Sequence, residues 1–245
     1  MNLVFDLGNT TQKMAVISSG KIVDIVKKAK IETKDIALFL EKYNPRHAIL
    51  SSVINETAEI VDFLEKRIFL LNFSHKTAVP IQNEYKTPDT LGSDRLASAV
   101  AATVLFPKKS ALILQMGTCL TSDFVTESGV YKGGSISPGL EMRLNAVHHF
   151  SAKLPLVAYK EVNSFMGTTT EESILAGIIY GIEDECNGVI ARYRSIYPSL
   201  KIILTGGDAK LFENKIKNEI FAFDNLVLVG LDVILNYNVE NKKNM

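Results

Sequence analysis

The chain has few cysteines and no excess of either charge, and each absence excludes a class of protein. Its 245 residues include two cysteines, Cys119 and Cys186, whose spacing suits neither a metal site nor a disulfide framework. A reducing compartment is therefore expected. The 27 basic and 27 acidic residues cancel and no basic stripe stands out, so nucleic acid and an anionic membrane are not expected as main partners. The hydrophobic share of 47 % is ample for one large domain or two small ones.

Long apolar runs are also missing. The N-terminal apolar run reaches Asp6 within six residues, which is too short for the core of a signal peptide. The longest weakly polar run, 96–106, is about half a membrane span, and Pro107 ends it. We therefore expect a cytoplasmic protein with no membrane partner.

Several well-known catalytic motifs are absent as well. The sequence has no Gly-x-Ser-x-Gly, no Walker Gly-Lys-Thr and no Gly-x-Gly-x-x-Gly element, which argues against hydrolase, P-loop and Rossmann enzymes. Its four histidines have no metal-ligand spacing, and we expect them to be structural or exposed. The chemistry is therefore expected in other turns between strands and helices.

What the chain does have is an alternation of strand-like and helix-like stretches, typical of an α/β protein. Strands are expected at 3–5, 13–17, 21–26, 48–50, 68–71, 111–114, 121–125, 201–204 and 226–229, and another begins at 130. Helices are expected at 33–43, 56–67, 92–105, 138–150, 170–194 and 209–218, with a final helix after them. The pattern breaks up between 72 and 91, and a loop of that length is often functional.

An internal repeat is the strongest organisational signal. Placing Gly8 over Gly117 also places Gly20 over Gly129 without a gap, and both of the latter lie at the turn between second and third strands. Two units of strand, turn, strand, turn, strand and helices predict a duplicated fold. Two such lobes facing each other would present their first hairpin loops to a shared nucleotide cleft.

The loop from Asp6 to Lys13 is the first candidate site. A strand that ends in Asp and continues into a tight Gly turn exposes backbone N–H groups that can point at phosphate oxygens. Asp6 could hold Mg²⁺ between the β- and γ-phosphates, and Lys13 adds a positive charge. An ordinary hairpin turn would explain the same residues, but their partial repetition at 117–121 favours phosphate binding.

The segment 92–95, at the head of a predicted helix, is the second candidate. Asp94 could act as a base toward a substrate hydroxyl, and Arg95 could bind a carboxylate or phosphate. Ser93 or Asp94 is also a natural helix N-cap. On these residues alone the capping role is favoured.

Three further glycine-containing turns have both a functional and a plain explanation. The segment 133–139 has two glycines after a strand, and Pro138 suits the first turn of a helix whose N–H groups could face an anion. Before the long helix, Thr169 and Glu172 spell a capping box, which explains that turn without a ligand. The glycines of 205–208 would let a base or ribose approach the backbone, although a plain turn explains them too.

Taken in order, these motifs resemble those of the type III pantothenate kinases, the Bvg accessory factor-like family within the superfamily of actin, sugar kinases and heat-shock ATPases. The resemblance runs from end to end of the chain. It rests on six motifs: Asp6–Thr10, Thr90–Arg95, Gly117–Thr118, Gly133–Gly139, Gly167–Thr170 and Thr205–Gly207. It implies an α/β fold of duplicated ribonuclease H-like (actin-like ATPase) lobes, 1–108 and 109–245, with a nucleotide cleft between them.

The resemblance also implies roles for individual residues. ATP would contact Asp6, Leu7, Gly8, Asn9, Thr10, Thr11, Gln12, Lys13 and Thr118, whereas pantothenate would contact Tyr85, Gly92, Ser93, Asp94, Arg95 and Thr170. Asp94 would be the proton acceptor, which reverses the preference for a helix cap. The implied reaction is ATP-dependent phosphorylation of pantothenate at its primary hydroxyl, the first step toward coenzyme A. The implied assembly is a homodimer.

One position departs from the family pattern. The second-lobe loop normally begins with an Asp that is associated with a monovalent cation, but this chain has Gln115 there. A carbonyl oxygen can coordinate potassium, so the site could persist in weaker form, or a Lys side chain or nothing could replace the ion. We expect ATP and Mg²⁺, or another divalent cation near Asp6, to be required. Dependence on K⁺ or NH₄⁺ stays open.

Two other functions remain open on the sequence. Gln115 is compatible with a non-catalytic protein that senses nucleotide or pantothenate on the same scaffold. The joint retention of Asp6, Asp94 and Arg95 argues against it. A related kinase or phosphatase for another small hydroxy acid would share the ATP loops but would need a different substrate pocket.

Overall fold

The computed structural model describes residues 1–54 and 57–243. Packing divides the chain into unit 1, which comprises 1–107, 129–132 and 225–245, and unit 2, which comprises 108–128 and 133–224. The lobes expected at 1–108 and 109–245 stay a prediction about the duplication. Packing differs from that division mainly because it assigns the stretch from residue 225 onward to unit 1.

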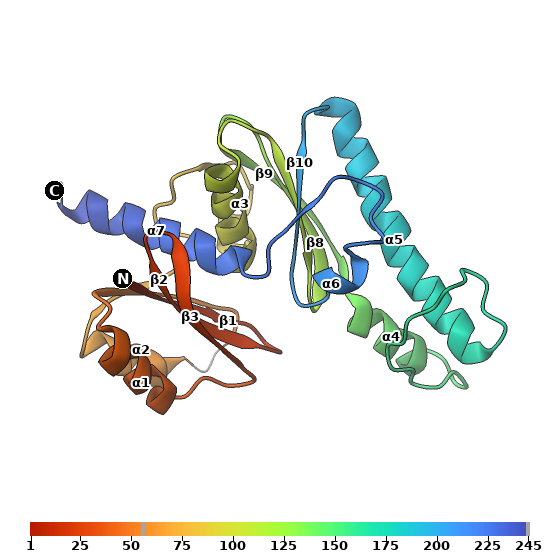
Figure 1. The fold of residues 1–245 in the computed structure, drawn as a ribbon, viewed down its shortest axis with the longest axis horizontal. Coiled ribbons are helices and arrows are strands. Elements are labelled where there is room, and N and C mark those ends of the chain that lie inside the picture. Colours follow the sequence, from red (N-terminus) through yellow and green to blue (C-terminus); the bar gives the residue numbers. More distant parts are fainter. Residues whose placement is uncertain (55–56, 244–245) are drawn as a thin grey trace. The chain divides into compact units, whose positions relative to one another are not determined.

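Unit 1 is built on a sheet whose strand order is β3-β2-β1-β4-β5; β1, β2 and β3 are labelled in Figure 1. The strands are β1 (Asn2–Leu7), β2 (Gln12–Ser18), β3 (Lys21–Lys28), β4 (His47–Ser52) and β5 (Phe69–Asn72). β2 is antiparallel to both β1 and β3, whereas β4 is parallel to β1 and β5. This register places Asp6 beside Lys13 of β2 and Ser51 of β4.

Helices cover both faces of this sheet. They are α1 (Thr33–Tyr43), α2 (Ala58–Glu65), α3 (Ser93–Leu105) and α7 (Leu226–Lys243). Leu3, Phe5 and Leu7 pack in one cluster with residues of α1 and α2, whereas Val4 packs with residues of α3 and α7. Because side chains alternate along a strand, Asp6 shares the α3 and α7 face with Val4.

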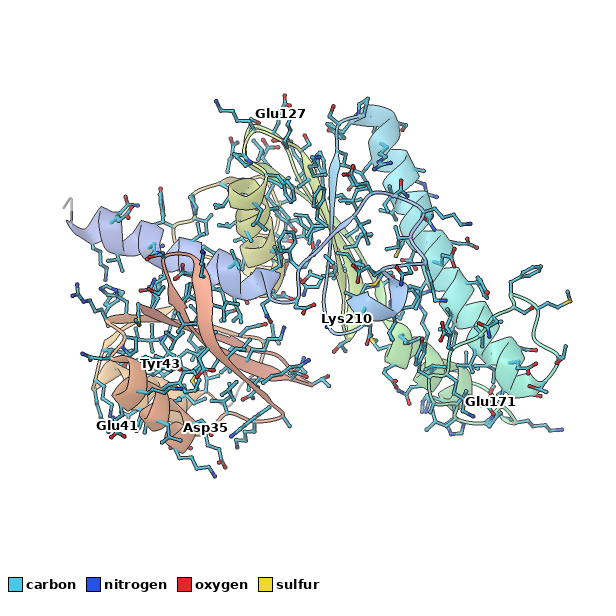
Figure 2. The ribbon with its side chains drawn as sticks, in the orientation of Figure 1. Asp35, Glu41, Tyr43, Glu127, Glu171 and Lys210 are labelled. Atoms are coloured by element: carbon cyan, nitrogen blue, oxygen red, sulfur yellow. The ribbon has the colours of Figure 1, made fainter. Side chains whose placement is uncertain are left out.

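The start of α1 shows how local sequence fixes an element. Glu32 and Asp35 form a capping box around the first turn. Asp35, labelled on α1 in Figure 2, accepts hydrogen bonds from the Glu32 N–H (3.1 Å) and from Lys28 Nζ (2.6 Å). The helix therefore begins at the residue where its sequence pattern begins.

The irregular stretch before α3 is anchored by a short strand pairing. β6 (Gln82–Asn83) pairs in parallel with the first residues of β9 (Val130–Pro138), and the 3₁₀ helix η1 (Pro88–Thr90) follows. Tyr131 of β9 is fully buried against Leu96 and Ala99 of α3. This contact holds the segment in front of α3 in place.

Unit 2 repeats the arrangement of strands. It contains β7 (Ala111–Met116), β8 (Cys119–Val125), most of β9, β10 (Lys201–Thr205), β11 (Phe221–Ala222), α4 (Leu140–His149), α5 (Thr170–Ile196) and α6 (Ala209–Phe212). The strand order is β11-β10-β7-β8-β9, with β6 added beyond β9; β8 is antiparallel to β7, whereas β10 is parallel to β7 and β11. Leu112, Leu114 and Phe124 form its core with residues of the three helices.

The two sheets confirm the expected duplication. Each has the order third, second, first, fourth, fifth strand of its own unit. The pairing is also equivalent, because Asp6 lies beside Ser51 of the fourth strand and Gln115 lies beside Thr205 at the corresponding place. The fold is therefore a duplicated α/β fold.

Some expected elements are wrong in detail. The segment 226–229 begins α7 and is not a strand. The sequence was misleading because this continuous apolar run, which is buried against the sheet, shows no helical period. Gly133 and Gly134 lie within β9, and Gly139, rather than Pro138, begins the turn into α4. The helix expected at 209–218 ends at Phe212. Among the described residues, each helix is too short or too polar to cross a lipid bilayer.

Candidate active site

The connection between β1 and β2 is a tight loop of short polar residues. Leu7 pairs with Gln12, so residues 8–11 form the turn, and the Gly8 N–H closes it with a 3.2 Å hydrogen bond to the Thr11 carbonyl oxygen. Asn9 and Thr10 are exposed at its tip. Backbone and side-chain groups of this turn are thus placed where an anion could reach them.

Two residues of this segment face inward. The Leu7 side chain lies in the core of unit 1, and the Gln12 side chain is buried and accepts a 2.7 Å hydrogen bond from the Ile31 N–H. Any contact of these two with a nucleotide would therefore come from their backbone. A pocket of about 1040 Å³ lies beside the loop, lined partly by Asn9, Gln12 and Lys34.

Asp6 is a half-buried carboxyl at the end of β1. The pKa of Asp6 is raised to about 6, and burial is the largest cause; nearby Lys13 lowers this pKa, and the negative charge of Asp94 raises it. The Lys13 ammonium donates a 3.3 Å hydrogen bond to Asn225 Oδ1. A carboxyl that is costly to ionise becomes a good ligand once a cation offsets the cost.

Asp94 lies near Asp6, on the first turn of α3. Gly92 occupies the N-cap of this helix, so the expected capping by Ser93 or Asp94 is wrong. Instead, Ser93 Oγ lies 2.8 Å from Ser51 Oγ on β4, directly beside Asp6 in the sheet. A Cβ atom at position 92 would lie 2.7 Å from Asp94 Oδ1, so a larger residue there would displace the carboxylate.

Arg95 and Tyr85 are also brought together. Arg95 is buried, and its guanidinium carbon lies 5.7 Å from the centroid of the Tyr85 ring. The centroid of the Tyr85 ring lies 6.2 Å from that of the Tyr131 ring. The backbone N–H of Tyr85 donates a 2.9 Å hydrogen bond to Asn83 Oδ1. The structure thus places two of the expected pantothenate contacts side by side in unit 1.

The remaining expected site residues lie in unit 2. Thr118 is exposed on the β7–β8 loop, where the Gly117 N–H donates to the Cys119 carbonyl oxygen at 3.0 Å. Gln115 is half-buried, with Thr121 and Thr205 as its strand neighbours. Thr170 is exposed at the start of α5, whose capping box is formed as predicted: the Thr169 hydroxyl accepts from the Glu172 N–H at 3.2 Å.

Sequence reasoning missed three residues that support this site. Ser51 links β4 to α3, Asn225 binds Lys13, and Tyr131 packs on the Tyr85 ring. Only Ser51 had a usable signal, because it directly follows the strand expected at 48–50, as Asp6 follows the strand expected at 3–5. The other two come from distant parts of the chain.

The carboxylates fit a divalent cation. Asp6 and Asp94 offer the oxygen ligands that Mg²⁺ prefers. Within the described ranges, no three His, Cys, Asp or Glu side chains lie close enough to hold an ion by themselves. A divalent ion at Asp6 would therefore complete its coordination with phosphate oxygens and water, as Mg²⁺ commonly does.

Comparison with known proteins establishes the family. The family model described as Type III pantothenate kinase matches residues 2–192. The chain belongs to the type III pantothenate kinase family. It is 42 % identical over 239 residues to the Type III pantothenate kinase of Phocaeicola vulgatus, covering 97 % of this chain and 99 % of that relative. Its identity to the Type III pantothenate kinase of Christiangramia forsetii is 45 % over 243 residues, with coverage of 97 % and 99 %.

Solved structures share the fold of this type III pantothenate kinase family member at low identity. A Baf family transcriptional activator from Campylobacter jejuni gives a TM-score of 0.64 at 18 % identity, covering 97 % of this chain and 99 % of that one. A glucokinase from an Antarctic psychrotroph gives 0.51 at 12 %, covering 96 % and 98 %. At these identities the likeness concerns the fold alone, and it confirms the expected actin-like fold class.

Proposed function

We propose that the protein transfers the γ-phosphoryl group of ATP to the primary hydroxyl of pantothenate, giving 4′-phosphopantothenate on the way to coenzyme A. One observation carries the proposal beyond family membership. Asp94 at the start of α3 lies close enough to Asp6 at the end of β1 for its negative charge to raise the pKa of Asp6. Phosphoryl transfer depends on positioning and charge neutralisation, and this pair provides a metal-side carboxylate and a base.

Each part of unit 1 has a distinct task in the proposed reaction. Asp94 accepts the proton of the attacking hydroxyl. The backbone of residues 8–11 and the Lys13 ammonium bind the phosphates, and Asp6 holds the divalent cation. A bound Mg²⁺ would supply neutralisation of the charge on the β- and γ-phosphates. Thr118 is proposed as a further ATP contact.

The proposed substrate matches the buried arginine. Pantothenate is a hydroxy acid, and its carboxylate needs a cationic partner with a fixed geometry, which a guanidinium provides. Arg95 meets this need beside the Tyr85 ring. Gly92, Ser93 and Thr170 complete the proposed pantothenate contacts.

A monovalent cation is proposed to act weakly in this protein. Gln115 stands where the family pattern has Asp, so its side chain can offer a carbonyl oxygen but no charge. K⁺ or NH₄⁺ would be held only by neutral oxygens there. We therefore propose a modest stimulation by these ions.

A homodimer is proposed in a cytoplasmic setting. Unit 2 exposes Phe150, Phe165 and Met166, with 85 %, 76 % and 66 % of their surface accessible. Large apolar side chains in such numbers are typical of a surface that associates. The low cysteine content of the chain suits a reducing compartment.

An ADP-release assay with the purified protein tests this function. ADP should form only when ATP, a divalent cation and pantothenate are all present, and the assay is repeated with Na⁺, K⁺ and NH₄⁺. A small hydroxy acid without the pantothenate amide serves as the competing substrate. Absence of pantothenate-dependent turnover under every cation would contradict the proposal. Faster turnover of the competing substrate would favour a related kinase.

A further inference from the structure

The Gly133–Gly139 motif has no task in the proposed reaction, yet its end packs against the loop that carries Thr118. The Gly139 N–H donates a 3.1 Å hydrogen bond to the Thr118 carbonyl oxygen. A Cβ atom at position 139 would lie 2.1 Å from the Gly117 carbonyl oxygen, a distance that no side chain tolerates. Glycine is therefore required at 139, and the position of its backbone constrains the loop.

The residues before Gly139 are fixed by a charged pair from two helices. Arg143 of α4 donates from Nε to the Pro138 carbonyl oxygen at 2.8 Å, and from Nη2 to Ser137 Oγ at 3.3 Å. The same Nη2 also pairs with Glu185 Oε2. Glu185, in the middle of α5, accepts a 2.5 Å hydrogen bond from Ser137 Oγ.

This network has more partners than the other ion pairs of unit 2. The Arg143 and Glu185 side chains are 21 % and 31 % exposed, so solvent screens their attraction only in part. Arg143 also contacts backbone and hydroxyl partners with a planar, forked group, a geometry that lysine lacks. By contrast, Lys217 reaches Glu183, also on α5, only at 3.8 Å and is 81 % exposed.

We propose that Arg143 and Glu185 are positioning residues for ATP binding. By fixing Ser137 and Pro138 they hold Gly139, and Gly139 holds the Gly117–Thr118 loop in the conformation that binds ATP. Both residues act through Gly139 and not on the nucleotide itself. The inference rests on the proposed function, in which Thr118 is an ATP contact.

Arg143→Lys is the main test, because it keeps the charge and removes the fork. The Kd of a non-hydrolysable ATP analogue, measured by calorimetry, and the KM for ATP should each rise about tenfold. The KM for pantothenate and the kcat at saturating ATP should stay within about twofold of wild type. Glu185→Gln keeps an acceptor for Ser137 and should give a smaller rise. The control Lys217→Ala removes the longer ion pair with Glu183 on the same helix and should leave ATP affinity unchanged.

Hydrogen exchange of the nucleotide-free protein gives a second readout that needs no activity. Exchange of a peptide covering 115–120 should be faster in Arg143→Lys and unchanged in Lys217→Ala. Unchanged exchange and ATP affinity, or an equal rise in KM for both substrates, would overturn the positioning role. If the wild-type protein binds ATP more tightly than Arg143→Lys does but phosphorylates no pantothenate, the proposed function alone would be overturned. A wild-type protein that binds no ATP would overturn both.

Discussion

Replacing Asp6 with Asn should make the protein more stable while removing its activity. The pKa of Asp6 is raised from 3.8 to about 6, mainly by burial. A carboxyl with a raised pKa holds its proton more tightly in the folded state than in the unfolded chain. Its contribution to stability is therefore fully present below pH 3.8 and is lost as pH rises through about 6. At one pKa unit per about 1.4 kcal/mol, the ionised carboxyl costs about 3 kcal/mol at pH 7.5.

Urea unfolding of the metal-free protein measures this cost. Asn is neutral at every pH, so Asp6→Asn should exceed wild type by about 3 kcal/mol at pH 7.5 but by only about 1 kcal/mol at pH 4.5. For a chain of this size the larger difference corresponds to a rise in Tm of about 6–12 °C. ADP release should fall at least about 100-fold, because an amide holds a divalent cation less tightly than a carboxylate.

The matched control is Asp89→Asn, an exposed carboxyl on η1, which should change neither stability nor its pH dependence. An Asp6→Asn variant that is less stable than wild type at pH 7.5 would refute the reasoning. So would a stability gain that does not vary between pH 4.5 and 7.5. Either result would mean that burial does not penalise the charge of Asp6.

Three further substitutions test other parts of the site. Asp94→Asn should lower kcat by about 1000-fold or more. Its ATP affinity and Tm should stay close to wild type, because Gly92 and not Asp94 occupies the N-cap of α3. A large fall in Tm would instead indicate a structural role for Asp94. Ser51→Ala removes the 2.8 Å bond to Ser93 and should lower kcat about tenfold in steady-state assays, and an unchanged kcat would show that this bond does not position the base. Gln115→Asp should increase stimulation in a potassium titration, and an unaltered titration would count against the cation assignment.

Elements with complete local signals could be predicted from the sequence. The helix expected at 33–43 is observed with those bounds, because its apolar stripe and its first-turn acid are both local. The capping box of Thr169 and Glu172 likewise marks the start of α5. The strand expected at 226–229 failed because an apolar run of four residues fits either element, and packing against β1 and α3 decides for the helix.

The site residues stay a prediction, and their arrangement could not be read from the sequence. Motif order identified Asp6 and Asp94, since each sits at the end of a recognisable element. Their supports are not visible in sequence, because they join segments that are far apart along the chain: 42 residues for Ser51 and Ser93, and 212 for Lys13 and Asn225. The raised pKa of Asp6 is equally hidden, since it follows from burial that only the folded chain creates.

The place of α7 in unit 1 has a consequence for biosynthesis. Leu228, Leu231 and Ile234 are fully buried with Val4 of β1, yet the ribosome makes them only after all of unit 2. Nascent domains usually fold in the order of their synthesis. Here the part of unit 1 that is translated first keeps an open apolar face until α7 is made, so a chain cut short before residue 225 leaves Val4 and its neighbours without their α7 partners.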